Sequence, residues 1–286
     1  MLLELKNVDY KYSEGSAFEA AALSDVNIGI EEGEFIAVIG HTGSGKSTLI
    51  QTMNALIKPT SGQVLFNGED INADKYDRRK LRTQVGLVFQ YPENQLFESD
   101  VISDVCFGPK NQGLSEEEAR ERAKAALKRV QISEDLFGCS PFELSGGQKR
   151  RVAIAGILAM EPKILILDEP TAGLDPMGRD YILDEAKRLQ TEKNVTVILV
   201  SHSMEDVAKY ASRVIVMSGG RVVTDGKPKE VFSKSDELEK INLSAPQVTY
   251  VMKELLKRGF DVDINAITVE EAKESIIKSI ERRRNA

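Results

Sequence analysis

The sequence predicts an α/β fold built on a mainly parallel, doubly wound sheet. Short apolar runs typical of buried strands alternate with helical patterns, and a glycine-rich loop joins the first such strand to the first such helix. The 286 residues suffice for one large domain with an appendage or for two medium domains. With 41% hydrophobic and 29% charged residues, the composition is that of an ordinary globular protein.

The first third of the chain is rich in predicted strands. Apolar residues alternate over 3–5 and 26–30, as expected of half-buried strands. The apolar run FIAVIG at 35–40 ends in glycine and predicts a fully buried strand, and a helical period follows it over 49–57. Two further strands are predicted at QVLFNG (63–68) and VGLVFQ (85–90).

Residues 91–160 form a predicted helical insertion in this pattern. Ser115 is a candidate N-cap, with Glu118 three residues later as its capping-box partner. Apolar residues then recur at helical spacing, at Ala119, Ala123, Ala126, Leu127 and Val130. We expect a helical subdomain over about 91–160 that ends in the helix after LSGGQ (144–148).

Strands return after the insertion. The runs ILIL (164–167), VTVILV (195–200) and RVIVM (213–217) predict three of them, and the last should pair through SGG with RVVTDG. Because these apolar strands alternate with helical segments, they extend the same parallel sheet.

A helical extension is predicted at the C-terminus. From about residue 230 the pattern is helical again, and LSAPQ (243–247) marks a break before two amphipathic helices. We expect one domain over 1–243 and a C-terminal extension over 244–286.

Charge and cysteine content exclude several classes of protein. A net charge of −7 argues against a general electrostatic hold on nucleic acid, although Lys149–Arg151 is compatible with a local basic patch. Cys106 and Cys139 lack metal-ligand spacing and predict reduced thiols in a cytosolic protein. The start MLLELKNVDY does not resemble a signal peptide, and the apolar run at 152–160 is about half the length of a membrane-spanning helix. We expect no crossing of a bilayer by this chain alone.

The loop after the strand at 35–40 has the pattern of a phosphate cradle. GHTGSGKST fits G-x-x-x-x-G-K-[ST] between a strand and a helix. Its glycines allow backbone N–H groups to point at phosphate oxygens, and the helix N-terminus adds its dipole. Lys46 would reach the β- and γ-phosphates and the Ser47 hydroxyl would bind Mg²⁺, with His41 and Thr42 as spacing residues. The predicted nucleotide contacts are Gly40, His41, Thr42, Gly43, Ser44, Gly45, Lys46, Ser47 and Thr48.

Acidic residues and a histidine follow two later strands. Asp168 ends the run ILILD at the carboxyl edge of the sheet, where it could hold Mg²⁺ through water. Glu169 lies one step further and could orient or deprotonate the attacking water. His202 follows the strand at 195–200 and could donate to the γ-phosphate, although an isolated histidine is more often structural.

The segment LSGGQ (144–148) places Ser145 and two glycines at a predicted helix N-terminus, which is a weak anion site. This segment resembles the signature motif of ATP-binding-cassette (ABC) ATPases. The cradle precedes it, and ILILDEP, GLD (173–175) and SHS (201–203) follow it in the family's order, so the resemblance spans residues 1 to about 230. The family's fold is a P-loop ATPase with a mainly parallel RecA-like core sheet, an N-terminal antiparallel β subdomain and a helical insertion.

The resemblance implies that two cassettes pack head to tail and enclose ATP between them. Ser145, Gly146, Gly147 and Gln148 would then contact the γ-phosphate held by the other cassette, and Asp175 would couple the two sites. Gln90 resembles the loop glutamine that contacts Mg²⁺ and the attacking water. Tyr12 resembles the aromatic residue that stacks on adenine, with Tyr10 as the competing choice. His202 becomes the expected γ-phosphate contact.

Three classes of ABC protein compete as the function of this chain: a transporter motor, a DNA-maintenance ATPase and a translation factor. The sequence has no sustained heptad pattern or zinc-ligand cysteines, which DNA-maintenance relatives usually carry. Translation factors of the superfamily carry two cassettes in one chain. We therefore expect a transporter motor that works with separate membrane subunits.

A finer resemblance lies in VFQYPENQLFESDVISDVCFGPKN (88–111). It is similar to the FQ-x-P-x-x-Q-L-F stretch and FGP-N segment of the energy-coupling-factor (ECF) branch. Thr42 favours the second, A2-type ATPase chain of these cobalt and vitamin importers, because the counterpart chain typically has asparagine there.

The ECF resemblance implies a set of partners. These are a second ABC ATPase chain, a different one or an identical copy, an integral-membrane coupling subunit and an exchangeable membrane subunit that binds a vitamin or a transition-metal ion. No nucleic acid partner is expected, and the chain would lie peripherally on the cytoplasmic face of the cell membrane. Tyr91, Leu96 and Phe97 are expected to receive the coupling helices, unless they pack into the insertion. The extension at 244–286 would contact the second ATPase or only cover the last strands, and the resemblance favours the contact.

Overall fold

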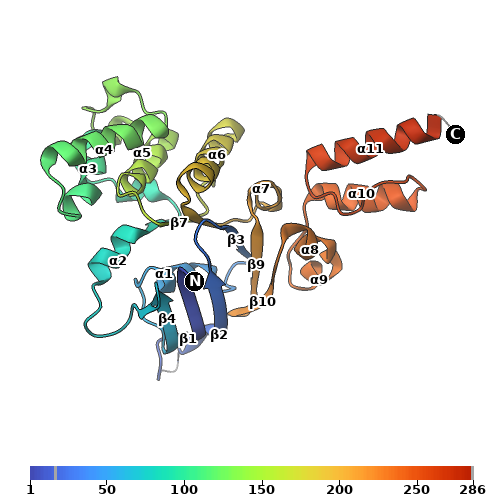
Figure 1. Ribbon diagram of the computed structural model, residues 1–286, viewed down its shortest axis with the longest axis horizontal. Helices are drawn as coiled ribbons and strands as arrows, with labels where there is room; N and C mark the ends of the chain where they lie inside the picture. The colour runs from blue at the N-terminus through green and yellow to red at the C-terminus, as the bar shows by residue number, and fades with distance from the viewer. Residues whose placement is uncertain (16–17, 285–286) are drawn as a thin grey trace.

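A computed structural model describes residues 1–15 and 18–284, and its larger sheet confirms the α/β prediction (Figure 1). The strand order is β10-β9-β3-β8-β7-β6, in which β10 is antiparallel to β9 and the other five strands run parallel. The bounds of these strands are β3 (Phe35–Gly40), β6 (Val85–Val88), β7 (Ile164–Asp168), β8 (Thr196–Val200), β9 (Arg213–Ser218) and β10 (Arg221–Gly226). The predicted pairing of 213–217 with RVVTDG is therefore correct.

Both faces of this sheet are covered, which explains why its strands read as continuous apolar runs. Within β7, Leu165 and Leu167 face the helical side, whereas Ile164 and Ile166 face the second sheet. The helical side holds α6 (Pro176–Lys193) and the insertion. The opposite side holds α1 (Lys46–Met53), α2 (Arg78–Gln84) and the antiparallel sheet.

The antiparallel sheet has the order β2-β1-β4-β5 and matches the expected N-terminal β subdomain. Its strands are β1 (Leu3–Tyr12), β2 (Ala20–Ile30), β4 (Ser61–Phe66) and β5 (Glu69–Asp70). The alternation predicted for strands at 3–5 and 26–30 holds, because Leu3, Leu5, Val26, Ile28 and Ile30 are all buried.

The insertion is helical, as predicted. Figure 1 shows its three α-helices grouped together at the upper left of the molecule. They are α3 (Val101–Asn111), α4 (Glu116–Arg129) and α5 (Gly146–Leu158). The 3-10 helix η1 (Pro92–Gln95) precedes α3, and η2 (Glu134–Leu136) and η3 (Pro141–Glu143) lie between α4 and α5. The capping box of Ser115 and Glu118 is present at the start of α4.

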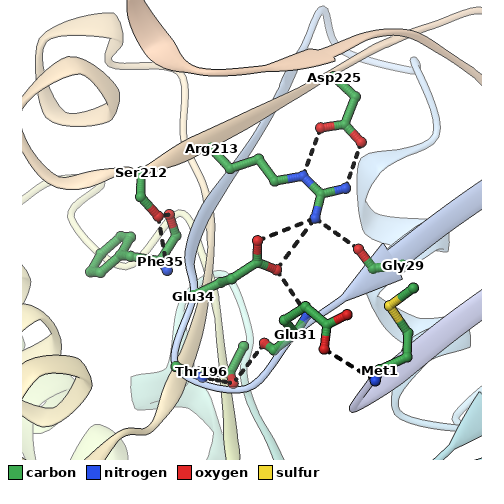
Figure 2. A network of polar contacts seen from close by, with 10 residues as sticks. Met1, Gly29, Glu31, Glu34, Phe35, Thr196, Ser212, Arg213 and Asp225 are labelled. Carbon is green, nitrogen blue, oxygen red and sulfur yellow. Dashed lines mark hydrogen bonds and ion pairs between the residues drawn. The ribbon is translucent and has the colours of Figure 1, made fainter.

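A polar network joins the two sheets at the amino-terminal edge of the parallel strands (Figure 2). Arg213, the first residue of β9, donates to both carboxylate oxygens of Asp225 at 2.7 and 2.6 Å. Its third nitrogen donates to the Gly29 carbonyl in β2 at 2.7 Å and lies 3.3 Å from the carboxylate of Glu34. Each charge in this network therefore has a partner, and the network fixes β2 against β9 and β10.

The C-terminal part of the chain also contains helices, the first between β8 and β9 and the others after β10. They are α7 (Met204–Tyr210), α8 (Pro228–Ser233), α9 (Ser235–Lys240), α10 (Gln247–Lys257) and α11 (Val269–Arg284). The last two helices project from the body of the molecule (Figure 1) and share a small core of Met252, Val262, Ala266 and Ala272. Both helices lie within the predicted extension over 244–286. Residues 285 and 286 of that extension lie outside the described part of the chain. Among the helices of residues 1–15 and 18–284, none combines the length and apolarity needed to span a bilayer.

Candidate active site

The predicted site residues come together at the carboxyl edge of the parallel sheet. The cradle follows β3, Gln90 follows β6, Asp168 ends β7 and His202 follows β8. Parallel strands bring their carboxyl ends to one edge, so four segments that are distant in sequence meet there. This is where open α/β sheets bind their ligands.

The cradle loop needs its glycines. Gly43 and Gly45 have φ of 81° and 102°, a left-handed conformation that side chains with a Cβ rarely adopt. A Cβ on Gly45 would also lie 2.4 Å from the Ala22 carbonyl oxygen, where no atom fits. Gly45 is the N-cap residue of α1, so the loop leads directly into a helix N-terminus with unpaired N–H groups.

Lys46 and Ser44 are arranged to receive an anion. The Lys46 ammonium is largely buried and donates to the carbonyls of Gly40 at 2.7 Å and His41 at 3.1 Å. Burial lowers the pKa of Lys46 from its ordinary value, although Glu169 and Asp168 oppose this effect. The Ser44 hydroxyl is buried without a hydrogen-bond partner among the described residues. Both groups therefore gain from a phosphate in the loop.

Asp168 is a carboxylate without full compensation. It is 7% exposed, and burial, followed by the charge of Glu169, raises its pKa to about 6. Lys46 and a hydrogen bond with Ser47 act in the opposite direction but do not cancel the burial. The Asp168 carboxylate and the Ser47 hydroxyl are hard oxygen ligands brought together beside the cradle, which fits a divalent cation such as Mg²⁺.

Glu169 is held between the two other predicted catalytic side chains. The Gln90 amide donates to one carboxylate oxygen of Glu169 at 3.3 Å, and Nε2 of His202 lies 2.9 Å from the other. Glu169 itself has a φ of 48°, a strained value for a residue other than glycine. The backbone is held there by a hydrogen bond from the Glu169 N–H to the Val200 carbonyl at 3.0 Å.

The two tyrosines of β1 have different surroundings. Tyr10 packs against the buried cluster between the two sheets, whereas Tyr12 is 45% exposed. The Tyr12 hydroxyl lies 3.1 Å from the Thr48 hydroxyl in the first turn of α1, which places this ring beside the cradle. The ring of Tyr10 supports Tyr12 edge-on, with 4.9 Å between centroids. Of the two residues, Tyr12 has the surface free for a nucleobase.

The signature segment lies apart from the cradle. Ser145 is the N-cap of α5, where its hydroxyl accepts from Gln148 N–H and its own N–H donates to the Gln148 side chain. Ser145 and Gly146 are exposed, and a Cβ on Gly146 would meet no atom within 4 Å. In Figure 1 the insertion that contains α5 is separated from α1. The described contacts of the chain do not join LSGGQ to its own cradle.

Two further predicted residues have local partners. The Asp175 carboxylate caps α6 by accepting from Gly178 N–H at 2.6 Å. Nδ1 of His41 lies 2.8 Å from the Thr42 carbonyl, which agrees with the expectation that these two residues shape the loop.

The structure buries two side chains whose placement the sequence left open. Arg150 is not part of a surface basic patch, because it is 3% exposed and its guanidinium bonds with Glu93. Leu96 packs into the insertion, which is one of the two alternatives stated for it, and at 7% exposure it still lines the groove beside Phe97. In each case the sequence shows residue type, but long-range packing decides which way the side chain points.

Phe97 does remain exposed, as predicted, at 58% of its surface. Its ring meets that of Phe107 edge-on, with 5.0 Å between centroids. The two rings line a groove of about 660 Å³ between the insertion and the core, together with Leu56, Phe89 and Met160. Phe107, from α3, belongs to this surface although the sequence analysis did not single it out; its place within the FGP-N segment was the available signal.

Comparison with known proteins identifies the family of the chain. The family model described as ABC transporter matches residues 23–172. The chain is 53% identical over 285 residues to the energy-coupling factor transporter ATP-binding protein EcfA2 of Caldanaerobacter subterraneus subsp. tengcongensis, with 100% of both chains covered. It is 55% identical over 282 residues to the EcfA2 protein of Clostridium acetobutylicum, with 98% of this chain and 99% of the relative covered.

Solved structures lead to the same family. CbiO1 from Clostridium perfringens, described as part of the ABC transporter complex CbiONQ, is 45% identical with a TM-score of 0.73, over 88% of this chain and 98% of CbiO1. The bacterial ABC transporter cassette MJ0796, solved as a dimer, is 35% identical with a TM-score of 0.73, over 79% and 98% of the two chains. The chain therefore belongs to the ABC transporter family, among the energy-coupling factor transporter ATP-binding proteins.

Proposed function

We propose that this chain is the ATP-hydrolysing motor subunit of an ECF-type importer that takes up a vitamin or a transition-metal ion through separate membrane subunits. The observation that carries the proposal is the Glu169 carboxylate, held between Gln90 and His202 beside the cradle. The relatedness to EcfA2 proteins favours this function over DNA maintenance or translation.

Each residue of the site has a task in hydrolysis. The cradle N–H groups and Lys46 bind and orient the phosphates of ATP, because a largely buried ammonium lies beside the N-terminus of α1. Glu169 positions the attacking water and accepts a proton from it. Gln90 and His202 hold the carboxylate in place, and His202 donates to the γ-phosphate.

We propose Ser47, Asp168 and Gln90 as the residues that hold Mg²⁺. The support is the pair formed by the Ser47 hydroxyl and the Asp168 carboxylate, whose raised pKa records a charge that lacks a sufficient counter-ion. Mg²⁺, when bound, supplies positive charge that neutralises the phosphates.

A second cassette would complete the site. Ser145, Gly146 and Gly147 are available at a helix N-terminus but lie apart from the cradle of their own chain, so their anion affinity is useful across an interface. Gln148 orders Ser145 through the capping box. Asp175 caps α6 and so orders the start of that helix, and we assign it to the coupling between the two sites. Binding of ATP would close the pair, and hydrolysis would open it.

The test is Glu169→Gln in both cassettes of the purified pair. The amide keeps the size of the side chain but cannot accept the proton, so we expect ATP binding to persist while hydrolysis falls by about three orders of magnitude. Turnover close to that of the unmodified pair would contradict the role of Glu169. Glu192→Gln on α6, an exposed carboxylate in a surface pair, is the matched control.

The groove beside Phe97 and Phe107 is the proposed docking site for helices of the membrane coupling subunit. Its exposed aromatic rings, with Tyr91 51% exposed nearby, form an apolar surface that is costly without a cover. Phe97→Ala should reduce co-purification with the membrane subunits, whereas Val223→Ala, an exposed apolar residue on β10, should not. Equal recovery of both variants with the membrane fraction would remove this proposal.

The extension at 244–286 is proposed as an additional contact between the two ATPase chains. Val251, Val269 and Ile277 leave apolar surface exposed in a shallow groove between α10 and α11. Val251→Glu should weaken pair formation without nucleotide while leaving the fold intact, because this side chain is 51% exposed. If neither this variant nor deletion of residues 244–286 altered pairing, the extension would be a cover for the last strands.

We place the chain peripherally on the cytoplasmic face of the cell membrane, held there by a coupling subunit and an exchangeable solute-binding subunit. The support is its relatedness to transporter ATP-binding proteins and to CbiO1 of the CbiONQ complex. Purification from membranes, with identification of the integral proteins and the second cassette that accompany the chain, tests this placement. Recovery with ribosomes or DNA would favour the rival classes.

A further inference from the structure

Arg150 is a buried residue of the insertion, and its guanidinium has several hydrogen-bond partners. Its guanidinium donates to both carboxylate oxygens of Glu93 at 3.2 Å, from Nε and from one terminal nitrogen. The other terminal nitrogen donates to the Ala172 carbonyl. The ring of Tyr91 lies 5.9 Å from the guanidinium carbon. One side chain, 3% exposed, thus contacts two segments of the chain besides its own helix.

Each of these segments carries a residue of the site. Glu93 lies in η1, three residues after Gln90 and four before Phe97. Ala172 lies in the loop that joins Glu169 to Asp175. Arg150 itself is in the second turn of α5, the helix that Ser145 caps. The guanidinium is therefore a direct link between the docking stretch, the signature helix and the catalytic loop.

The chemistry of this contact requires an arginine. A guanidinium presents a rigid, planar fork that can bind a carboxylate with two nitrogens and still donate from the third, whereas a lysine ammonium cannot reproduce that geometry. Stability alone does not account for the pair, because well-packed apolar residues of similar volume often replace a buried ion pair without loss. What the ion pair adds is a fixed distance between the segments that it joins.

We infer that Arg150 is a positioning residue, which holds η1, the start of α5 and the loop after Glu169 in one register. The inference rests on the proposed function. Movement of η1, which adjoins the Phe97 docking surface, displaces Glu93 and through Arg150 displaces both α5 and the Ala172 carbonyl. The hydrolytic site thereby responds to what is bound at the docking surface.

The test compares three variants in the transporter complex purified from membranes. Arg150→Lys keeps a charge without the fork, Arg150→Met leaves Glu93 unpaired, and Arg150→Met with Glu93→Leu replaces the pair by apolar groups. Arg122→Gln, which removes a surface pair with Glu161 on the same insertion, is the matched control. The measurements are kcat and KM for ATP, together with the thermal midpoint.

The double variant separates positioning from stability. We expect its thermal midpoint to return toward that of the unmodified complex, since no charge is left buried and unpaired. Its kcat should nevertheless stay about ten- to a hundredfold low, with KM for ATP within about twofold, because the loop after Glu169 is misplaced. Arg150→Lys should show the same split between kcat and KM.

Recovery of kcat together with the thermal midpoint in the double variant would overturn the inference and leave Arg150 a structural residue. A failure of the proposed function has a different signature. In that case the unmodified complex would not hydrolyse ATP, or Glu169→Gln would hydrolyse it as fast as the unmodified complex.

Discussion

Charged side chains at the two edges of the parallel sheet differ in whether their partners compensate for burial. At the amino-terminal edge, Arg213 bonds with Asp225, Glu34 and the Gly29 carbonyl, and its charge is fully compensated. The hydrogen bonds that Arg213 donates to Asp225, more than the other contacts, raise the pKa of Arg213 above its usual range. At the carboxyl edge, burial lowers the pKa of Lys46 and raises that of Asp168.

The direction of these pKa changes differs between the two edges of the sheet. Where partners outweigh burial, as at Arg213, the charged form stabilises the fold. Where burial outweighs partners, as at Lys46 and Asp168, the charged form is costly until a ligand arrives. The following predictions test the comparison, beginning with the largest effect.

Lys46→Ala should abolish most nucleotide binding without destabilising the ligand-free protein. The variant loses the charge-assisted contacts to phosphate, which corresponds to a loss of about a hundredfold in affinity for ATP. The ligand-free fold loses little, because the ammonium is partly desolvated there and bonds only with carbonyls of its own loop. Titration calorimetry and urea unfolding measure the two quantities, with the exposed Lys58→Ala as control. If the unfolding free energy fell by as much as the binding free energy for ATP, the proposed contrast between the two edges would be wrong.

Asp168→Asn should stabilise the ligand-free protein above pH 6. A carboxyl whose pKa is raised from 3.8 to about 6 in the folded protein contributes stability below pH 3.8 and loses it as the pH rises through 6. Asparagine does not ionise, so at pH 8 the variant should gain up to about 3 kcal/mol in unfolding free energy relative to the unmodified protein.

This gain at pH 8 should be accompanied by loss of Mg²⁺-dependent hydrolysis. Urea unfolding between pH 4 and pH 8 gives the first quantity, and an ATPase assay over a Mg²⁺ series gives the second. An Asp168→Asn protein that is less stable than the unmodified protein at pH 8 would show that Asp168 is already compensated without a ligand.

Arg213→Met should have the opposite effect, a loss of stability with an intact site. Removal of the guanidinium leaves Asp225 and Glu34 half-buried without their partner, and the expected cost is about 2 kcal/mol. KM for ATP should not change, because Arg213 begins β9 whereas the cradle follows the carboxyl end of the parallel strand β3. Arg258→Met, which removes an exposed pair on α10, should cost under about 0.5 kcal/mol. If the change in KM, converted to free energy, exceeded the loss of unfolding free energy, the two edges would be coupled.

Tyr12→Ala should have the smallest effect, a rise of about fivefold in KM for ATP. The loss corresponds to one aromatic contact of about 1 kcal/mol, and Tyr12→Phe should retain most of it because the ring remains. Tyr10→Ala should instead lower the unfolding free energy, because Tyr10 packs in the core. Should Tyr10→Ala raise KM more than Tyr12→Ala, the assignment of the adenine-stacking ring would be reversed.

The sequence predicted the sheet and the cradle because both depend on short-range patterns. A run such as FIAVIG can only be buried on both faces, and GSGKST has the glycines that the loop conformation requires. The β9–β10 hairpin and the capping boxes of α4 and α5 are local in the same sense. The short helix α2 was missed, because a seven-residue segment with one buried residue carries almost no periodic signal.

By itself the sequence determined which residue types are present for ATP chemistry and in what order. Only the tertiary structure decided which of them meet. Chain topology brings Gln90 and His202 to opposite oxygens of Glu169, and it buries Arg150 and Leu96, whose placement the sequence left open. The physical reason is that local conformation follows from neighbouring residues, whereas burial and charge compensation depend on segments that meet only after the chain has folded.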